Sequence, residues 1–179
     1  MDSPDDEGRL MMSLYEPLLT ELQQESATTR RLLERLPESA LSWKPHEKSM
    51  SMGHLAVHIA RLLQLLNSVL NQEDYDIAAS GFGMTEPDSR AGIMELFDQA
   101  LATAVEALKK QPDERLLALW RMRNGEQVIF QMPRTSVIRT MILNHMTHHR
   151  GQLSVYLRLQ NVPLPPIYGP TADETPKLP

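Results

Sequence analysis

The sequence contains no cysteine. Disulfide bonds and thiolate ligands are therefore excluded, and a metal site in this chain has to use nitrogen and oxygen donors. A surplus of basic residues is also missing, because the formal net charge is −5 and the isoelectric point is near 5.7. Binding to nucleic-acid phosphates requires a basic surface, so we expect no nucleic-acid partner.

Long apolar runs are absent as well. No uncharged apolar stretch approaches the ~20 residues that a helix needs to cross a bilayer. The acidic first residues, Met1 to Glu7, contain neither the basic nor the apolar segment of a secretory signal. We therefore expect a cytoplasmic protein without a membrane partner.

Several familiar catalytic motifs are missing, among them HExxH, a glycine-rich phosphate loop and a Ser-His-Asp order with informative spacing. What the sequence has instead is a cluster of histidines. Three of the six histidines fall within nine residues, Asn144-His-Met-Thr-His-His-Arg-Gly-Gln152. Imidazole nitrogen is the metal ligand that this cluster offers.

Apolar residues recur at helical spacing in four segments, with polar and charged residues between them. The segments run from about residue 10 to 36, 52 to 70, 89 to 110 and 134 to 160. Pro17 lies inside the first segment, so that helix is expected to begin near Pro17 or to bend there. Four amphipathic helices of similar length predict an all-α fold, a four-helix bundle.

Polar residues mark the expected helix starts, and a turn signal lies between the third and fourth helices. Ser49 or Ser51 can cap the second helix, and Thr135 or Ser136 the fourth. Apolar runs on both sides of Asn124-Gly125 predict a short β-hairpin between helices 3 and 4.

The length of the chain fits one domain. We expect a disordered N-terminus at 1–9, a single bundle domain at 10–174 and a tail at 175–179. Residues 71–88 are expected to form a loop, because Gly81, Gly83 and Pro87 interrupt any helical pattern.

The histidine spacing defines a candidate metal site. His145 and His149 are four residues apart, which places both on the inward face of the fourth helix and leaves His148 on its flank. On the second helix His58 lies closer to the inward stripe than His54, so His58 is the better third ligand and His54 the second choice. Three imidazoles would leave a divalent metal an open coordination position. The alternative is a set of hydrogen-bonded core histidines without a metal, and spacing alone gives both equal weight.

The remaining polar candidates receive simpler interpretations. Glu25 lies on the inner edge of the first helix and is expected to pair with an arginine rather than to contact the site. Arg150 is expected to face outward, solvated or bound to a carboxylate. His46, His54 and His148 are expected at the surface, or supporting a metal ligand from outside.

Three stretches resemble the DinB/YfiT-like superfamily. His145-Met-Thr-His-His149-Arg-Gly-Gln152 is similar to the fourth-helix signature of that group. Trp43-Lys-Pro-His-Glu-Lys-Ser49, followed by Leu55-Ala-Val-His58-Ile-Ala60, resembles its entry into the second helix, and Asn161 to Glu174 resembles its ending. The likeness extends over about residues 10–174. It implies a four-helix bundle whose divalent metal is held by one histidine of the second helix and two of the fourth, here His58, His145 and His149.

The resemblance also implies a function. It suggests a metal-dependent transferase or hydrolase that acts on a small-molecule substrate, with the metal activating a water or a low-molecular-weight thiol. Homodimers are frequent in the group. Zinc, nickel or iron would suit three imidazoles. The alternative function is a non-catalytic bundle with a structural metal or a small-ligand-binding role.

Overall fold

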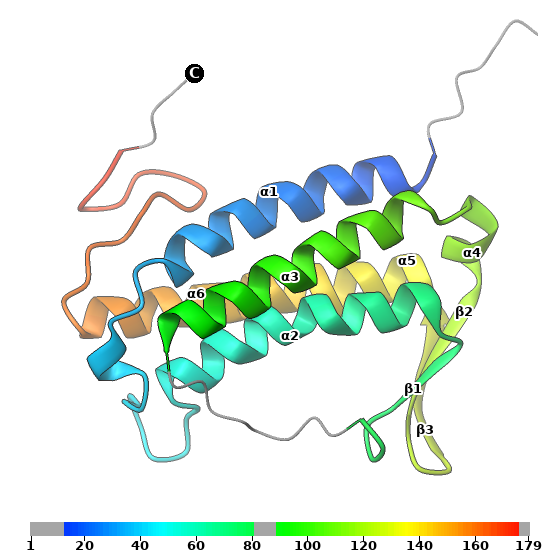
Figure 1. Ribbon diagram of the computed structural model, residues 1–179, viewed down its shortest axis with the longest axis horizontal. Coiled ribbons are helices and arrows are strands. Elements are labelled where there is room, and N and C mark those ends of the chain that lie inside the picture. Colours follow the sequence, from blue (N-terminus) through cyan, green and yellow to red (C-terminus); the bar gives the residue numbers. More distant parts are fainter. Residues whose placement is uncertain (1–12, 81–88, 176–179) are drawn as a thin grey trace, which may run out of the picture.

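The computed structural model describes residues 13–80 and 89–175. The predicted disordered segment 1–9, and all but the first residue of the predicted tail 175–179, lie outside these residues. Four long helical stretches run side by side as an elongated bundle, with a β-hairpin at one end (Figure 1). The predicted all-α four-helix bundle with a hairpin between helices 3 and 4 is confirmed.

The bundle consists of three single helices and one composite helix. The single helices are α1 (Tyr15–Leu33), α2 (Met52–Asn71) and α3 (Arg90–Lys109). The composite helix joins α5 (Arg134–Val137), the π-helical segment η2 (Ile138–Asn144) and α6 (His145–Leu159). Two short helices, η1 (Glu38–Ala40) and α4 (Asp113–Leu117), lie in the connections.

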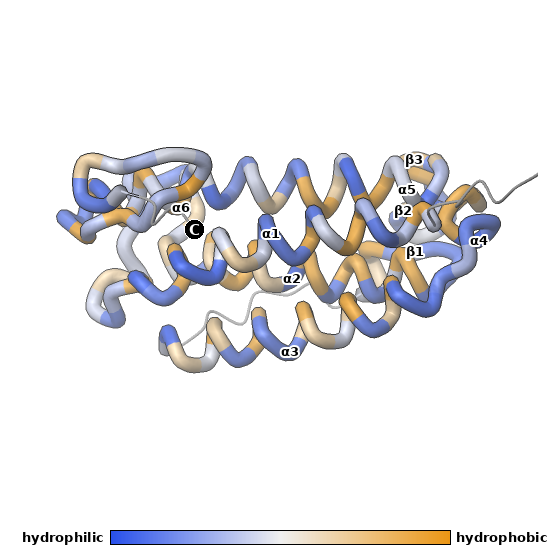
Figure 2. The backbone as a smooth tube through the Cα atoms, turned by 90° about the horizontal axis from the view of Figure 1, so that it is seen from above, coloured by the Kyte–Doolittle hydropathy of each residue, from blue (hydrophilic) through white to orange (hydrophobic). Residues whose placement is uncertain are grey.

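Helix α2 is the central helix of the bundle. It contacts α3, α6 and η2. Its apolar residues face these neighbours and are buried, as the helical spacing predicts. Figure 2 shows the same arrangement, with hydrophobic positions concentrated on α2 and on the sides of the other helices that face it. No helix in the described part of the chain is long and apolar enough to span a membrane.

Capping side chains fix the starts of α2 and α3. Ser51 accepts a hydrogen bond from the backbone N–H of His54 at 3.1 Å, and Ser89 accepts one from Gly92 at 3.1 Å. Ser51, rather than Ser49, is therefore the cap of α2. The prediction of Thr135 or Ser136 as a cap for the fourth helix is wrong. That helix begins at Arg134 after Pro133, no side chain caps it, and the backbone N–H of Arg134 donates to the Ala118 carbonyl at 3.1 Å.

The start of α1 shows how the chain accommodates Pro17. The helix begins at Tyr15, so Pro17 lies in the first turn, where its missing N–H costs no helical hydrogen bond. Asp113, at the start of α4, accepts hydrogen bonds from the Ser13 hydroxyl and from the backbone N–H of Leu14, both at 2.9 Å. A carboxylate from another part of the chain therefore caps this helix.

The hairpin belongs to a three-stranded sheet. Its strands are β1 (Asp74–Asp76), β2 (Leu119–Asn124) and β3 (Gln127–Pro133), in the order β1-β2-β3. Strands β2 and β3 are antiparallel, and Gly125 has a φ of +59° in their turn, a conformation that glycine adopts without strain.

Strand β1 corrects the expectation of a loop at residues 74–76, and residues 81–88 of that predicted loop lie outside the described part of the chain. It pairs in parallel with β2, and Tyr75 faces Met122 across the pair. Asp76 accepts a hydrogen bond from the backbone N–H of Gly125 at 2.9 Å and forms an ion pair with Arg123 at 2.6 Å. Three residues are too few for an alternating pattern to be visible in the sequence, and the contacts that hold this strand come from residues far along the chain.

Arg134 joins the bundle to the sheet from a fully buried position. Its Nε donates to the Val69 carbonyl at 2.9 Å, and one Nη donates to the Gln72 carbonyl at 2.9 Å and to the Glu73 carboxylate at 3.0 Å. The other Nη donates to the Leu119 carbonyl at 3.1 Å. The first residue of the fourth helix therefore binds both the end of α2 and the start of β2 through its guanidinium.

Arg150 corrects a second expectation. It is only 1% exposed instead of facing solvent, because its side chain extends between α1 and the C-terminal segment. It forms an ion pair with Glu25 at 2.7 Å, and Tyr168 donates a hydrogen bond to the same carboxylate at 2.8 Å. The prediction that Glu25 pairs with an arginine is confirmed.

Candidate metal centre

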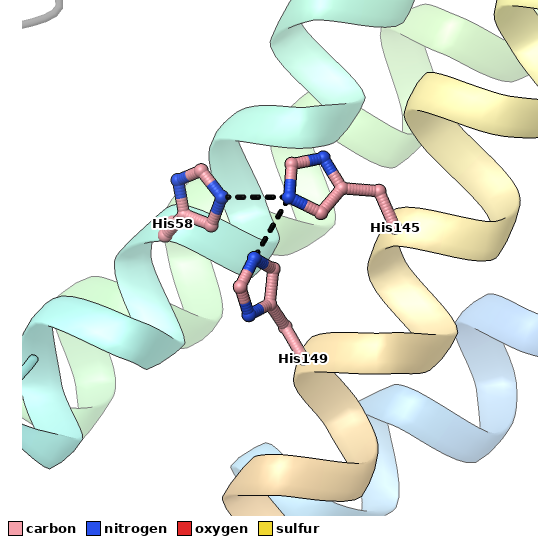
Figure 3. Close-up of side chains that lie close together, drawn as sticks. All are labelled: His58, His145 and His149. Atoms are coloured by element: carbon pink, nitrogen blue, oxygen red, sulfur yellow. Dashed lines mark hydrogen bonds between the residues drawn. The ribbon is translucent and has the colours of Figure 1, made fainter. Parts of the chain in front are cut away.

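Helices α2 and α6 bring three imidazoles together at the middle of the bundle. Figure 3 shows His58 on one helix pointing toward His145 and His149 on the other. The Nε2 atoms of His145 and His149 are 2.8 Å apart, and those of His58 and His145 are 3.5 Å apart. The three residues each offer a nitrogen within 4.8 Å of the other two, and they could hold a metal ion.

The structure places the other histidines outside this group. His148 is exposed and only its ring edge packs against His149, with ring centroids 5.0 Å apart. His54 lies one turn before His58, and His46 is exposed in the connection between α1 and α2. No carboxylate of residues 13–80 or 89–175 joins the three imidazoles. That His58, His145 and His149 bind a metal stays a prediction, but they are the set that converges.

The π-helical segment η2 was not visible in the sequence, yet it sets the orientation of the site. Its i→i+5 hydrogen bonds make a wider turn than the α-helix has, and it ends at Asn144, immediately before His145. Because α6 is regular from His145 onward, His145 and His149 keep their one-turn spacing. Segments of this kind occur frequently at functional sites.

Hydrogen bonds fix the tautomers of the two α6 histidines. Nδ1 of His149 lies 2.7 Å from Oε1 of Gln152, so Nδ1 carries the proton of the neutral ring. The ring of His145 hydrogen-bonds to the backbone of Met141. Each ring therefore donates its proton to a fixed partner and keeps a lone pair on Nε2. Gln152 had no role assigned from the sequence, although its position three residues after His149 puts it on the same helical face.

Two lone pairs at 2.8 Å repel each other unless a positive centre lies between them. A proton or a metal ion can supply that charge. Burial favours the metal, because it lowers the pKa of His145 and of His149 below the ordinary value. For His149 the hydrogen bond to Gln152 opposes part of this effect.

Among the three histidines, His58 has the pKa that is lowered most. Burial, followed by the neighbouring charges of His149 and His145, lowers its pKa to about 4. All three imidazoles are therefore neutral near pH 7. The neutral ring is the form that binds a metal.

These pKa shifts predict how the stability of the metal-free protein depends on pH. In the unfolded chain the three histidines titrate near 6.5, whereas in the folded chain their pKa values are lower. Between those values the unfolded chain binds more protons, so the free energy of unfolding should fall as the pH drops from about 6.5 toward 4. Thermal unfolding of chelator-treated protein at pH 7 and pH 5 measures this effect, because carboxylates titrate mainly at lower pH.

The variant His58→Asn should flatten that dependence, since it removes the group with the largest shift. His46→Asn is the matched control and should leave the dependence unchanged, because His46 lies in an exposed connection away from the site. Equal melting temperatures at pH 7 and pH 5 for the unsubstituted chain would contradict the assignment.

A cavity of about 210 Å³ lies next to the imidazoles. His58 and His145 form part of its wall, and the rest comes from α2, η2, the first two strands of the sheet and Ile77, which follows β1. The centre therefore has a space beside it that a small molecule can enter. This space could not be predicted from local patterns, because β1 and β2 are distant in sequence and form one wall only through their pairing.

Comparison with known protein sequences identifies a family and a similar protein. The model of the DinB family matches residues 11–177. YrdA of Bacillus subtilis, an uncharacterized protein, is 28% identical over 171 residues, which cover 94% of this chain and 96% of YrdA.

Solved structures show the same fold. A DinB-like protein from Bacillus cereus is 24% identical, with a TM-score of 0.69 over 86% of this chain and 97% of that one. YfiT from Bacillus subtilis is 12% identical, with a TM-score of 0.60 over 90% of this chain and 94% of YfiT. YfiT is described as a probable metal-dependent hydrolase with an unusual four-helix bundle topology.

Proposed function

The chain belongs to the DinB family, and from that premise we propose that it is a divalent-metal-dependent enzyme, a hydrolase or a transferase, acting on a small molecule. The observation that carries the proposal is the convergence of three histidine side chains, with the Nε2 atoms of His145 and His149 2.8 Å apart, beside a cavity. The description of YfiT as a probable metal-dependent hydrolase supports the hydrolytic version.

The donor set fits a divalent transition metal. A tetrahedral zinc with Zn–N bonds of about 2.0–2.1 Å separates its ligand nitrogens by about 3.3 Å. The distance between His58 and His145, 3.5 Å, is close to that separation, and the 2.8 Å between His145 and His149 requires a small movement of the two rings apart. Imidazole ligands also suit nickel and iron. Three protein ligands leave one position open, which is typical of catalytic rather than structural sites.

When bound, a divalent metal supplies Lewis acidity, which polarises a substrate oxygen or lowers the pKa of a water or thiol. The protein's own groups prepare that centre. Gln152 holds the His149 ring with its Nε2 facing inward, and the backbone at Met141 does the same for His145. Burial keeps the rings neutral, and the cavity gives the substrate a place beside them. The nucleophile we propose is a water or a low-molecular-weight thiol.

Elemental analysis of protein purified without an affinity tag tests the proposal. We expect about one divalent metal ion per chain, because three ligands converge on one point. The proposal would be wrong if the protein contained no metal and took up no zinc, nickel or iron on reconstitution. The three histidines would then be hydrogen-bonded core residues.

Removing the metal separates a catalytic from a structural role. A structural metal contributes its binding energy to folding, so chelation would greatly lower the melting temperature. The helices that carry the three histidines also contribute buried apolar side chains to the core, among them Ile59, Met146 and Leu153. We therefore expect the chelated bundle to remain folded, with only a modest decrease in melting temperature. A collapse of the fold on chelation would favour a non-catalytic, structural metal.

A further inference from the structure

We infer that the cavity beside His58 and His145 binds a compact apolar group of the substrate, and that the substrate's metal-binding atom lies one or two bonds from that group. This inference rests on the proposed function, because it uses the metal as the second point of attachment. It goes further by naming the chemical class of the substrate: a small, uncharged, hydrophobic molecule with one polar head.

The cavity wall is almost entirely apolar. Apart from the two imidazoles it is lined by Leu62, Leu65, Tyr75, Ile77, Met122 and Met141. No charged side chain among the described residues lines it. A charged or strongly hydrated group would lose its hydration there without compensation, so the cavity selects against such groups.

The wall is held in place from outside. Tyr75 and Met122 are paired across β1 and β2, and the ion pair between Asp76 and Arg123 at 2.6 Å fastens the same two strands. Asp76 also accepts a hydrogen bond from Gly125 in the hairpin turn. The cavity between these strands and the bundle is an apolar space that is partly open to solvent. The ion pair between Asp76 and Arg123 holds the two strands together and so maintains this space next to the three imidazoles. Such an arrangement is expected of a binding site.

The volume limits the size of the bound group. A dry apolar cavity of about 150 Å³ holds benzene, and drug-sized ligands occupy about 300–1,000 Å³. The cavity of about 210 Å³ therefore fits one aromatic ring or a short branched alkyl chain. His58 and His145 form part of the same wall, so an oxygen, sulfur or nitrogen atom one or two bonds from the hydrocarbon reaches the metal. Aryl or short-alkyl esters, amides and thiol adducts have this form.

A pair of hydroxamates tests the inference by binding affinity, independently of turnover. Acetohydroxamate and benzohydroxamate carry the same metal-binding head, and only the second adds a ring. Isothermal titration of the zinc-loaded protein should show at least about tenfold tighter binding of benzohydroxamate, because the ring leaves water for the cavity. The metal content of the protein is measured first in the same sample.

Variants of residues on β2 test whether the tighter binding of benzohydroxamate depends on the cavity. Met122→Trp fills the cavity and should bring the affinity ratio of the two hydroxamates close to one. Leu119→Trp is the matched control on the same strand, because Leu119 is 54% exposed and lies outside the cavity, and it should keep the ratio. Leu65→Phe fills the cavity from α2 and provides a second variant if Met122→Trp does not fold.

The outcomes distinguish the inference from the proposed function. A ratio of ten or more that the cavity variants abolish supports the inference. A ratio near one in protein that holds zinc overturns the inference and leaves the metal-dependent function standing. A ratio of ten or more that Met122→Trp and Leu65→Phe both preserve also overturns it, because the ring then binds elsewhere. Protein that takes up no metal overturns both.

Discussion

Replacing His145 by alanine is expected to abolish metal retention. Nε2 of His145 is the atom that lies near both other ligands, 3.5 Å from His58 and 2.8 Å from His149. Without the imidazole of His145, only His58 on α2 and His149 on α6 remain as metal ligands. Loss of a supporting group outside the ligand set typically weakens metal binding about 10–100-fold, so loss of this direct ligand should exceed 100-fold. Competition with a chromophoric chelator, together with elemental analysis after dialysis, measures the change.

His148→Ala is the matched control for that experiment. It removes the same side chain three residues further along the same helix, but from an exposed position. It should therefore retain about one metal ion per chain. Circular dichroism of both variants confirms that the bundle is folded. Full metal content in a variant with alanine at 58, 145 and 149 together would show that the metal binds elsewhere and would remove the basis of the proposed function.

Arg134→Ala is expected to cause the largest loss of stability of any single charged residue discussed. The substitution removes a hydrogen-bond donor from the carbonyls of Val69, Gln72 and Leu119, and it leaves Arg115 as the ion-pair partner of Glu73. A buried polar group left without its hydrogen-bond partner costs about 1–3 kcal/mol, and the loss of several such bonds together is expected to cost about 3–5 kcal/mol. Urea unfolding followed by circular dichroism should show a loss of that order in the free energy of unfolding.

Arg139→Ala provides the comparison. Arg139 lies in the same composite helix, but its side chain is 50% exposed and pairs with Glu21 at the surface. Exposed ion pairs contribute about 0–1 kcal/mol, so this variant should unfold close to the unsubstituted protein. Similar small losses for both variants would mean that water replaces the guanidinium of Arg134, and that the sheet does not depend on it for attachment to the bundle.

The helices, and the shared helical face of His145 and His149, could be predicted because both depend on local rules. Apolar spacing identified the four helical segments, and Ser51 and Ser89 begin their helices in the way that capping chemistry requires. The turn at Asn124-Gly125 gave the hairpin for the same reason. His145 and His149 share a face because a regular helix starts at His145.

The parts that could not be predicted depend on contacts between distant residues. Strand β1 exists because Asp74 to Asp76 meet a strand that begins more than forty residues later. Arg150 appeared outward on a helical wheel, but its long side chain reaches Glu25 on another helix and is buried there. The cavity has the same origin, since the residues of its wall come from α2, β1, β2 and η2. No window of the sequence contains these partners together.

Because of the π-helical segment η2, the chain between the sheet and the metal centre can lose one residue without changing the direction of the metal ligands. The i→i+5 hydrogen bonds of η2 hold one residue more per turn than i→i+4 bonds would. A chain with one residue fewer between Ile138 and Asn144 can continue as an α-helix and still present His145 and His149 in the same direction. An insertion between those two histidines has no such compensation, because it breaks their one-turn spacing. Relatives that differ in length here can therefore keep the same centre, whereas the four-residue interval inside α6 has to stay fixed.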